Sequence, residues 1–328
     1  MLEVPSGLSN EQIQTWEALV GRVVTLDERV WGKSVGAKVI NQWLDNFSGR
    51  TGLPVWEERL HALYMLSQFM YFGSREIRIL LRSLYRDLFL LPMAHSVKAR
   101  TASEYEFSVE LKKILVESRF LGVGNPSESG VHLLYYFRQE NSLSKHDFMD
   151  AAQIYKYEQG SEGRKRSLRY ENVKRYVFID DMCGSGETAV RYSNDVLPDL
   201  MELKPEVELH YLCLFGTKKG MDRVRSASRF GENAAAVFEL DDSYKWALPG
   251  ARYKSGLPNG LSAGTLDAIA QVYGAMLWGR HPLGYEDGQL LLGFFHNTPD
   301  NTMPVIWRDV DNGPPPPWSP IFRRYPKV

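Results

Sequence analysis

One stretch, Tyr176 to Val190, constrains this chain more than any other part of its sequence. It begins with apolar and aromatic residues that favour strands, and these lead directly into two adjacent carboxylates, Asp180 and Asp181. A short loop with two glycines follows, and after the loop the residues favour a helix. The stretch therefore predicts a strand with an acidic end, then a tight loop, then the start of a helix.

The loop of this stretch has the chemistry of an anion site. Gly184 and Gly186 permit backbone conformations that a β-carbon would forbid, and they let a ligand approach the peptide N–H groups. Ser185 and Thr188 add hydroxyl donors where the unpaired N–H groups at the start of the helix point outward. We expect a phosphate to bind here.

The segment Asp180 to Thr188 resembles the ribose-phosphate-binding signature of the type I phosphoribosyltransferases, in which a hydrophobic strand and two acids precede a loop ending in Ser/Thr-Gly-x-Thr. In that family the two acids bind the ribose hydroxyls of phosphoribosyl pyrophosphate (PRPP), and the loop wraps the 5′-phosphate. The resemblance implies that Asp180 and Asp181 are catalytic and grip the ribose directly or through Mg²⁺. It also implies a phosphate-binding set made of Cys183, Gly184, Ser185, Gly186, Glu187 and Thr188.

Two positions depart from the family pattern. Many members have a third carboxylate where this chain has Gly184, and a small residue where it has Glu187. A carboxylate beside a phosphate repels it unless it points away or meets a cation. The loop therefore favours a phosphoribosyl-binding site more firmly than a standard transfer reaction, and a non-catalytic protein that senses a nucleotide is an alternative.

A second resemblance supports another class of enzyme. The segment Cys183 to Gly186 is similar to the cofactor loop of some nucleic-acid methyltransferases, which usually read Asp-Pro-x-Cys-Gly-Ser-Gly-Thr. Here Asp181 replaces the proline, and the next strand, Leu209 to Phe215, runs into a basic segment instead of the acid that binds the adenosine ribose. An S-adenosylmethionine-dependent methyltransferase and a plain turn that binds no ligand are thus the competing interpretations.

The composition describes an ordinary globular protein. With 44% hydrophobic and 24% charged residues, the 328-residue chain can bury a large core, and its net charge of −1 argues against a surface that binds nucleic acid throughout. We find no signal-peptide pattern and no apolar run long enough to span a bilayer, so we expect a cytoplasmic protein with no membrane partner. Cys183 and Cys213 are too few for a zinc site and are expected to be reduced thiols.

The periodicity predicts a helical N-terminal region, residues 1–103, followed by an α/β domain, residues 104–328, with a largely parallel sheet and a proline-rich tail. Ser9 and Gln12 make a capping box for the first helix. A third helix is expected over residues 56–72, and a fourth is expected to begin after Ser74 and to stop at Pro92.

Polar residues follow other predicted strands of this sheet. Lys218 and Lys219 follow the strand over residues 207–215, and Asn297 follows an apolar strand over residues 289–295. A small-residue segment, Phe120 to Gly130, is a tight turn and a second candidate loop. The resemblance to the type I phosphoribosyltransferases implies that this loop meets the pyrophosphate, and an ordinary connection is the alternative. Because ligands of open α/β sheets bind at the carboxyl ends of parallel strands, we expect these groups and Asp180 to converge at one edge.

Residues 105–328 as a whole resemble a bacterial phosphoribosyltransferase-like group found in conflict systems. The resemblance adds the Asn-Thr-Pro segment from Asn297 and the final segment from Trp318 to Arg324 to the acidic loop. Members are associated with anti-phage defence loci, some of them beside retron reverse transcriptases. The resemblance implies a toxin-like effector that a partner protein, or a complex of reverse transcriptase and nucleic acid, restrains until infection. The acceptor, the partner and the oligomeric state are left open by the sequence.

Overall fold

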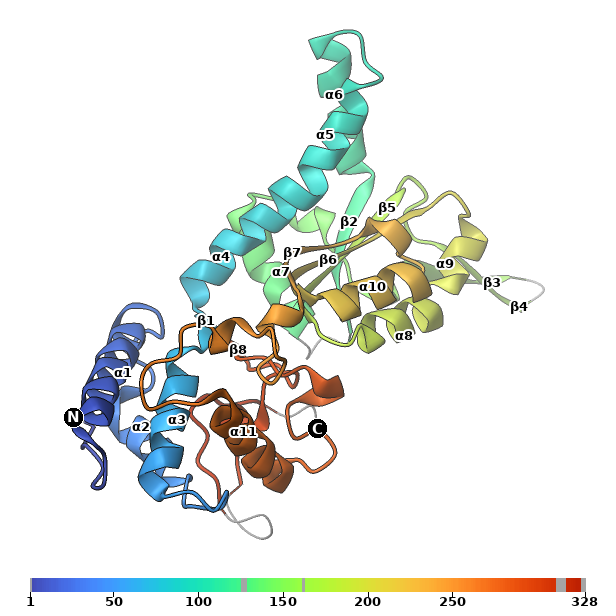
Figure 1. Ribbon diagram of the computed structural model, residues 1–328. Helices are drawn as coiled ribbons and strands as arrows, with labels where there is room; N and C mark the ends of the chain where they lie inside the picture. The colour runs from blue at the N-terminus through green and yellow to red at the C-terminus, as the bar shows by residue number, and fades with distance from the viewer. Residues whose placement is uncertain (1, 125–128, 161–162, 311–316, 326–328) are drawn as a thin grey trace. The chain divides into compact units, whose positions relative to one another are not determined.

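The computed structural model describes residues 2–124, 129–160, 163–310 and 317–325 (Figure 1). The chain forms two compact units. Unit 1 joins residues 1–77 to residues 241–328, and unit 2 contains residues 78–240. The domain boundary predicted after residue 103 falls inside unit 2 in this division by contacts, and it stays a prediction.

Unit 1 is mostly helical. Its elements are α1 (Asn10–Arg29), α2 (Gly36–Asp45), α3 (Val55–Ser67), β1 (Met70–Phe72), η5 (Asp242–Tyr244), η6 (Arg252–Lys254), α11 (Ala263–Leu277), η7 (Tyr285–Asp287), β8 (Leu292–Phe294) and α12 (Pro304–Trp307). The capping box at the start of α1 is confirmed: the Ser9 hydroxyl accepts from the Gln12 N–H, and the Gln12 side chain accepts from the Ser9 N–H.

Unit 2 follows after α4 (Ser74–Ser83), which crosses the division between the units. Its elements are η1 (Leu84–Leu90), α5 (Leu91–Lys98), α6 (Glu104–Val116), β2 (Ser118–Gly122), α7 (Ser129–Glu140), η2 (Lys145–Asp147), η3 (Ala151–Gln153), β3 (Tyr155–Gly160), β4 (Gly163–Leu168), β5 (Arg175–Cys183), α8 (Glu187–Val196), α9 (Pro198–Leu203), β6 (Glu208–Thr217), α10 (Lys218–Ala227), η4 (Gly231–Asn233) and β7 (Ala234–Leu240).

The sheet of unit 2 is parallel, as predicted. Its four strands lie in the order β2-β5-β6-β7, and every neighbouring pair runs in the same direction. The carboxyl ends of all four strands therefore meet at one edge. The basic segment between Tyr155 and Arg175 contains a separate antiparallel pair of strands, β3 and β4, with Tyr155 opposite Leu168.

Helices cover both faces of this sheet, so unit 2 has three layers (Figure 1). On one face Phe120 packs against Phe89 of η1 and Phe137 of α7, with ring centroids 5.3 and 5.2 Å apart. On the other face Phe178 and Tyr211 share a buried cluster with α8 and α10. Burial on both faces explains why β5 and β6 contain continuous apolar runs, Tyr176–Ile179 and Tyr211–Phe215.

The helix expected to stop at Pro92 continues to Lys98, so that prediction is wrong. The chain widens into π-helical turns over Leu84–Leu90, and the Leu91 N–H donates to the carbonyl of Arg86, five residues back. Pro92 then stands in the first turn of α5, directly after the π-helical turns. The π-turns thus allow the helix to pass through the proline.

Two further predictions are corrected by the pairing of β1 with β8. The helix expected over residues 56–72 ends at Ser67, and Met70–Phe72 forms β1. The strand expected over residues 289–295 exists as β8, but it pairs in parallel with β1 in a two-stranded sheet of unit 1. Asn297 therefore does not follow a strand of the sheet that carries Asp180, and the expectation of one shared sheet edge is wrong for Asn297.

Candidate functional site

The acidic pair lies inside strand β5, which runs four residues beyond Ile179, the last residue of its apolar start. Asp180 pairs in register with Cys213 of β6, and the strand ends at Cys183 opposite Gly216. Asp180 is half-buried and Asp181 is only 7% exposed. Asp180 is therefore partly shielded from solvent, and Asp181 is almost fully shielded.

Hydrogen bonds hold the Asp180 carboxylate in place. Its Oδ2 accepts from the Tyr211 hydroxyl at 2.9 Å, and its Oδ1 accepts from the backbone N–H of Asp181 at 2.9 Å. Burial raises the pKa of Asp180 well above the ordinary range of an aspartate, and the adjacent Asp181 carboxylate raises it further, while the bond from Tyr211 acts in the opposite sense. A cation or a hydroxyl-rich ligand would relieve the repulsion within this pair.

The two cysteines lie beside this pair as buried free thiols. Burial, with a smaller contribution from Asp180, raises the pKa of Cys183 to about 12, and burial also raises the pKa of Cys213. Thiols with raised pKa values are poor nucleophiles and poor metal ligands. If Cys183 serves the predicted phosphate set, it does so through its backbone.

The loop after β5 ends at a helix whose start has no side-chain cap. Gly186 is the N-cap of α8 and adopts a left-handed conformation with φ of 73°. The Ser185 hydroxyl accepts from the Glu187 N–H at 3.3 Å, and the Thr188 side chain is exposed. Glu187 is half-buried in the first turn. Ser185 thus satisfies the N–H of Glu187, and the other N–H groups of the first turn, with the partial positive charge of the helix start, favour a bound anion.

The glycines of this loop have a packing role that sequence reasoning missed. A β-carbon on Gly186 would lie 2.6 Å from the carbonyl oxygen of Gly220 in α10, and one on Gly220 would lie 2.2 Å from the carbonyl oxygen of Gly184. Thr217 bridges the same two segments, since its hydroxyl donates to the Gly184 carbonyl at 2.6 Å and accepts from the Gly220 N–H at 2.9 Å. The loop that precedes α8 and the first turn of α10 are therefore held in close contact.

The predicted basic residues lie in the first turn of α10, at the edge that carries the loop. Lys218 is exposed and its ammonium pairs with the Asp222 carboxylate at 3.0 Å. Lys219 follows it on the same turn. Arg223, which the sequence did not single out, donates to the Ser185 carbonyl at 3.4 Å. The edge thus combines two helix starts with several cations, which suits a polyphosphate better than a neutral ligand.

A cavity of about 280 Å³ lies at the carboxyl end of β2, the neighbour of β5. It is lined by Gly122, Gly124, Leu134, Phe148, Met149, Asp150 and Ala151. Gly122 pairs in register with Ile179, the residue before the acidic pair. The first part of the predicted second loop therefore lies next to the acidic pair, and residues 125–128 of that loop lie outside the described residues.

The acidic pair can contribute oxygen ligands to Mg²⁺. Among the residues that the structure describes, no group of three or more His, Cys, Asp or Glu side chains could hold a metal ion. Mg²⁺ does not need such a group, since it is commonly held by one or two carboxylates and completes its shell with water and substrate phosphates. Asp180 and Asp181 are two adjacent carboxyl groups at one sheet edge, which is the number of protein ligands that this mode uses.

Asn297 has local partners in unit 1. Its side-chain oxygen accepts from the Thr298 N–H at 3.0 Å and from the Tyr325 N–H at 3.1 Å. Arg324 of the same tail pairs with Asp300 at 2.8 Å. These bonds make Asn297 part of a turn that anchors the C-terminal tail, and its place in the ligand site stays a prediction.

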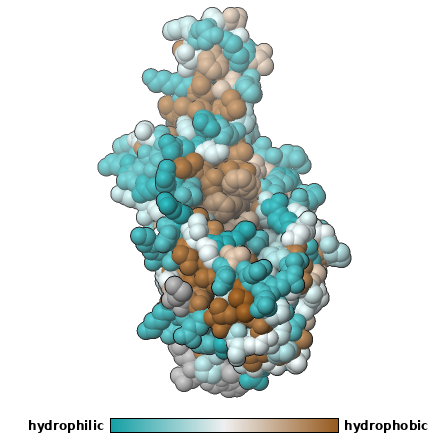
Figure 2. Space-filling view, turned by 60° about the vertical axis from the view of Figure 1, so that its left-hand side comes forward, coloured by the Kyte–Doolittle hydropathy of each residue, from teal (hydrophilic) through white to brown (hydrophobic). Residues whose placement is uncertain are grey.

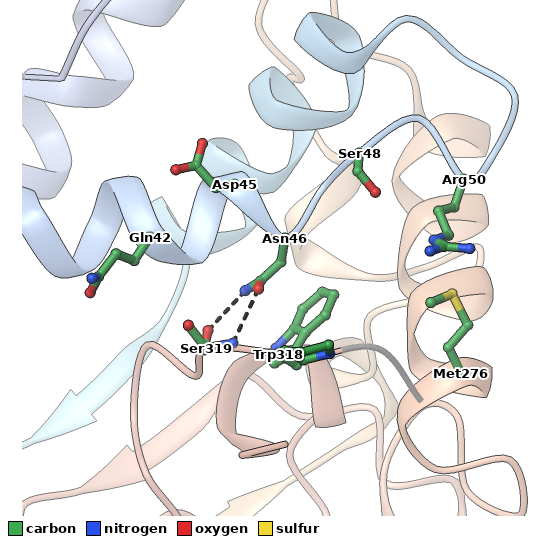
Figure 3. Close-up of a pocket in the computed structure, with 9 residues that line it drawn as sticks. Gln42, Asp45, Asn46, Ser48, Arg50, Met276, Trp318 and Ser319 are labelled. Atoms are coloured by element: carbon green, nitrogen blue, oxygen red, sulfur yellow. Dashed lines mark hydrogen bonds between the residues drawn. The ribbon is translucent and has the colours of Figure 1, made fainter. Parts of the chain in front are cut away.

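A cavity of about 370 Å³ also opens on unit 1, and it contains none of the predicted site residues (Figure 3). One of its walls is structural, because the Asn46 side chain accepts from the Ser319 N–H at 3.1 Å and donates to the Ser319 carbonyl at 2.8 Å. Trp318 beside it is buried against Phe47 and Tyr273. This cavity therefore lies where the C-terminal tail is hydrogen-bonded to the end of α2.

The fold and the site together define a phosphoribosyltransferase-like protein: a parallel sheet with an acidic pair and a glycine loop at the start of the next helix. The model of the PRTase-CE family, in which PRTase denotes phosphoribosyltransferase, matches residues 40–324. The chain belongs to that family. The match extends into both compact units: it includes the sheet, the helical part from residue 40 onward and the tail to residue 324.

Solved structures with weak similarity were also found. They include a xanthine-guanine-hypoxanthine phosphoribosyltransferase from Helicobacter pylori, with 11% identity over 53% of this chain and 88% of that chain and a TM-score of 0.28. A hypothetical protein from Neisseria gonorrhoeae with bound ppGpp has 9% identity over 53% of this chain and 86% of its own, with a TM-score of 0.27. A protein from Aquifex aeolicus has 12% identity, coverage of 63% and 85%, and a TM-score of 0.28. Likenesses at this level do not bear on function.

No match is found among curated proteins. Within the described ranges, no helix has both the length and the apolar character needed to cross a bilayer.

We predict that Gly220→Ala destabilises the protein by about 3 kcal/mol, because the new methyl group would collide with the Gly184 carbonyl. Alanine is normally the better helix former, so a loss isolates the collision. Gly21→Ala in α1 is the control, since no atom lies within 4 Å of its added β-carbon. Urea unfolding measures the loss of stability in each variant. Equal unfolding midpoints for the two variants would show that the close contact between the loop before α8 and α10 does not limit residue 220.

Proposed function

We propose that this protein binds a 5′-phosphoribosyl group, as PRPP or as a nucleotide, at the edge formed by β5, α8 and α10. In this proposal the backbone N–H groups from Gly184 to Thr188 hold the 5′-phosphate, and Asp180 and Asp181 hold the ribose hydroxyls. The observation that carries the proposal is the uncapped start of α8 directly after an acidic pair, beside the basic start of α10.

The two halves of the site suit the two halves of such a ligand. The helix starts and the lysines attract the phosphates, whereas the carboxylates accept hydrogen bonds from the ribose hydroxyls. Transfer of a ribosyl group passes through a sugar with positive charge, and carboxylates beneath the ring stabilise that charge. When bound, Mg²⁺ held by Asp180 and Asp181 would neutralise the pyrophosphate and improve it as a leaving group.

The proposal extends to biology through the resemblance to conflict-system proteins. We propose that the protein is an effector of a bacterial anti-phage defence system, restrained by a partner protein or by a complex of reverse transcriptase and nucleic acid. Infection of cells that carry the complete locus tests this part: Asp180→Asn with Asp181→Asn should abolish protection. Unchanged protection would show that defence does not require this site.

The methyltransferase interpretation is less well supported. It requires an acid at the end of the strand after the loop, to bind the adenosine ribose. That strand, β6, ends at Thr217, and the next residues are Lys218 and Lys219. Calorimetric titration with S-adenosylmethionine distinguishes the two classes, and we expect no binding.

We predict that Asp180→Asn with Asp181→Asn lowers the affinity for PRPP and Mg²⁺ at least tenfold, because the ribose and metal ligands lose their charge. Isothermal titration calorimetry measures it. Glu206→Gln, which changes an exposed carboxylate just before the start of β6, away from the carboxyl ends of the strands, is the matched control and should bind normally. Thermal unfolding verifies that the double variant folds, and wild-type affinity in that variant would refute the proposed site.

The proposal leaves two modes, turnover and sensing, which chromatography after incubation with PRPP or nucleotides separates. Formation of pyrophosphate or of a free base would identify an enzyme. Tight binding without any product would identify a sensor, which is the mode that Gly184 and Glu187 favour as departures from the family pattern.

Glu187 provides a second test of the loop. A unit charge about 8 Å from the phosphate at an effective dielectric of about 20 contributes roughly 2 kcal/mol of repulsion before screening. Glu187→Gly and Glu187→Gln should therefore both bind PRPP several times more tightly. Weaker binding by both would mean that the Glu187 carboxylate supports the site, through Mg²⁺ or a lysine.

A further inference from the structure

Helices α5 and α6 form a hairpin, here called the arm, that extends beyond the sheet of unit 2 (Figure 1). The turn between them is well defined: the Ser103 hydroxyl accepts from the Glu106 N–H, the Glu106 carboxylate accepts from the Ala102 N–H, and Lys98 pairs with Glu104. Ile114 is the buried residue of α6. The turn of the arm is therefore held by hydrogen bonds, and α6 packs through the face that carries Ile114. The opposite, outer face of α6 has a different character.

The outer face of α6 carries an exposed apolar stripe. Tyr105, Val109 and Val116 are 79%, 45% and 54% exposed. Together with Lys112 they are spaced four, three and four residues apart, so they form a single line on the helix, opposite Ile114. Figure 2 shows apolar side chains on the arm, at the top of the view. Single exposed apolar residues are ordinary, but an aligned stripe indicates a contact surface.

The charged residues beside the stripe are arranged so that two copies of α6 can bring opposite charges together. The first turn of α6 carries Glu104 and Glu106, and the later part carries Lys112 and Lys113. Two copies paired antiparallel would bring the acidic end of one helix to the basic end of the other. Glu106 and Lys113 are seven residues apart and flank the stripe on the same side, and in an antiparallel helix pair such positions face each other. Parallel pairing would instead oppose like charges.

We propose that the occupant of this surface is a second copy of the chain, bound through α6 in an antiparallel, two-fold symmetric pair. Tyr105 of one copy then packs near Val116 of the other, and Val109 lies near the axis. A two-fold contact uses the same patch on both copies, which is what a self-complementary stripe provides. A 13-residue helix is only about 20 Å long, so the contact is small and the dimer is expected to dissociate at micromolar concentrations. This inference does not depend on the ligand of the sheet edge.

Sedimentation velocity of the full chain from about 1 to 100 µM tests the proposal. The wild type should shift from monomer towards dimer. Val109→Lys should stay monomeric, because in this register each new ammonium group lies opposite Lys112 of the other copy. Val24→Lys, on α1 and 42% exposed in the wild type, is the matched control and should dimerise normally. Circular dichroism verifies folding of each variant.

A charge exchange tests the antiparallel arrangement itself. Glu106→Lys should weaken the dimer, and the same chain with Lys113→Glu added should regain it, because the pair is restored with its charges reversed. Failure of that rescue would exclude antiparallel pairing. A wild type that is monomeric at every concentration, or a Val109→Lys variant that still dimerises, would overturn the proposal.

Discussion

The close contact between the loop after β5 and the first turn of α10 is the constraint on which the site depends. Gly186 and Gly220 can approach only because neither has a side chain, and the Thr217 hydroxyl joins the two segments through hydrogen bonds on both sides. The contact places two helix starts next to each other at one sheet edge. Their partial positive charges add there, and the first turn of α10 contributes two lysines.

The acidic pair supplies the opposite half of the site. Asp180 is held by Tyr211 from the neighbouring strand, and burial beside Asp181 makes it costly to ionise both groups without a counter-charge. An anion-attracting loop next to a cation-seeking or hydroxyl-seeking pair matches a ligand that has a phosphate, a diol and bound Mg²⁺. The phosphoribosyl group combines all three, and this match underlies the proposed function.

Local patterns predicted much of this. The parallel sheet, the strand–loop–helix order and the capping box at Ser9 follow from periodicity and turn residues, which act over a few positions. Contacts distant in sequence could not be predicted, such as the pairing of β1 with β8 that removes Asn297 from the main sheet. The helix continues beyond Pro92 because π-helical turns precede it, and no residue pattern in the sequence predicts such turns. Within the site, the residue types were predictable but the burial of Asp181 and the Tyr211 bond were not, because both depend on β6 and its neighbours.

The most direct test of the central claim is a crystal structure of the protein soaked with PRPP and Mg²⁺. The account predicts that the 5′-phosphate lies against the backbone N–H groups at the start of α8, with the ribose hydroxyls or a bound Mg²⁺ at Asp180 and Asp181. PRPP bound elsewhere, or its absence from this edge at saturating concentration while the loop is accessible, would contradict it.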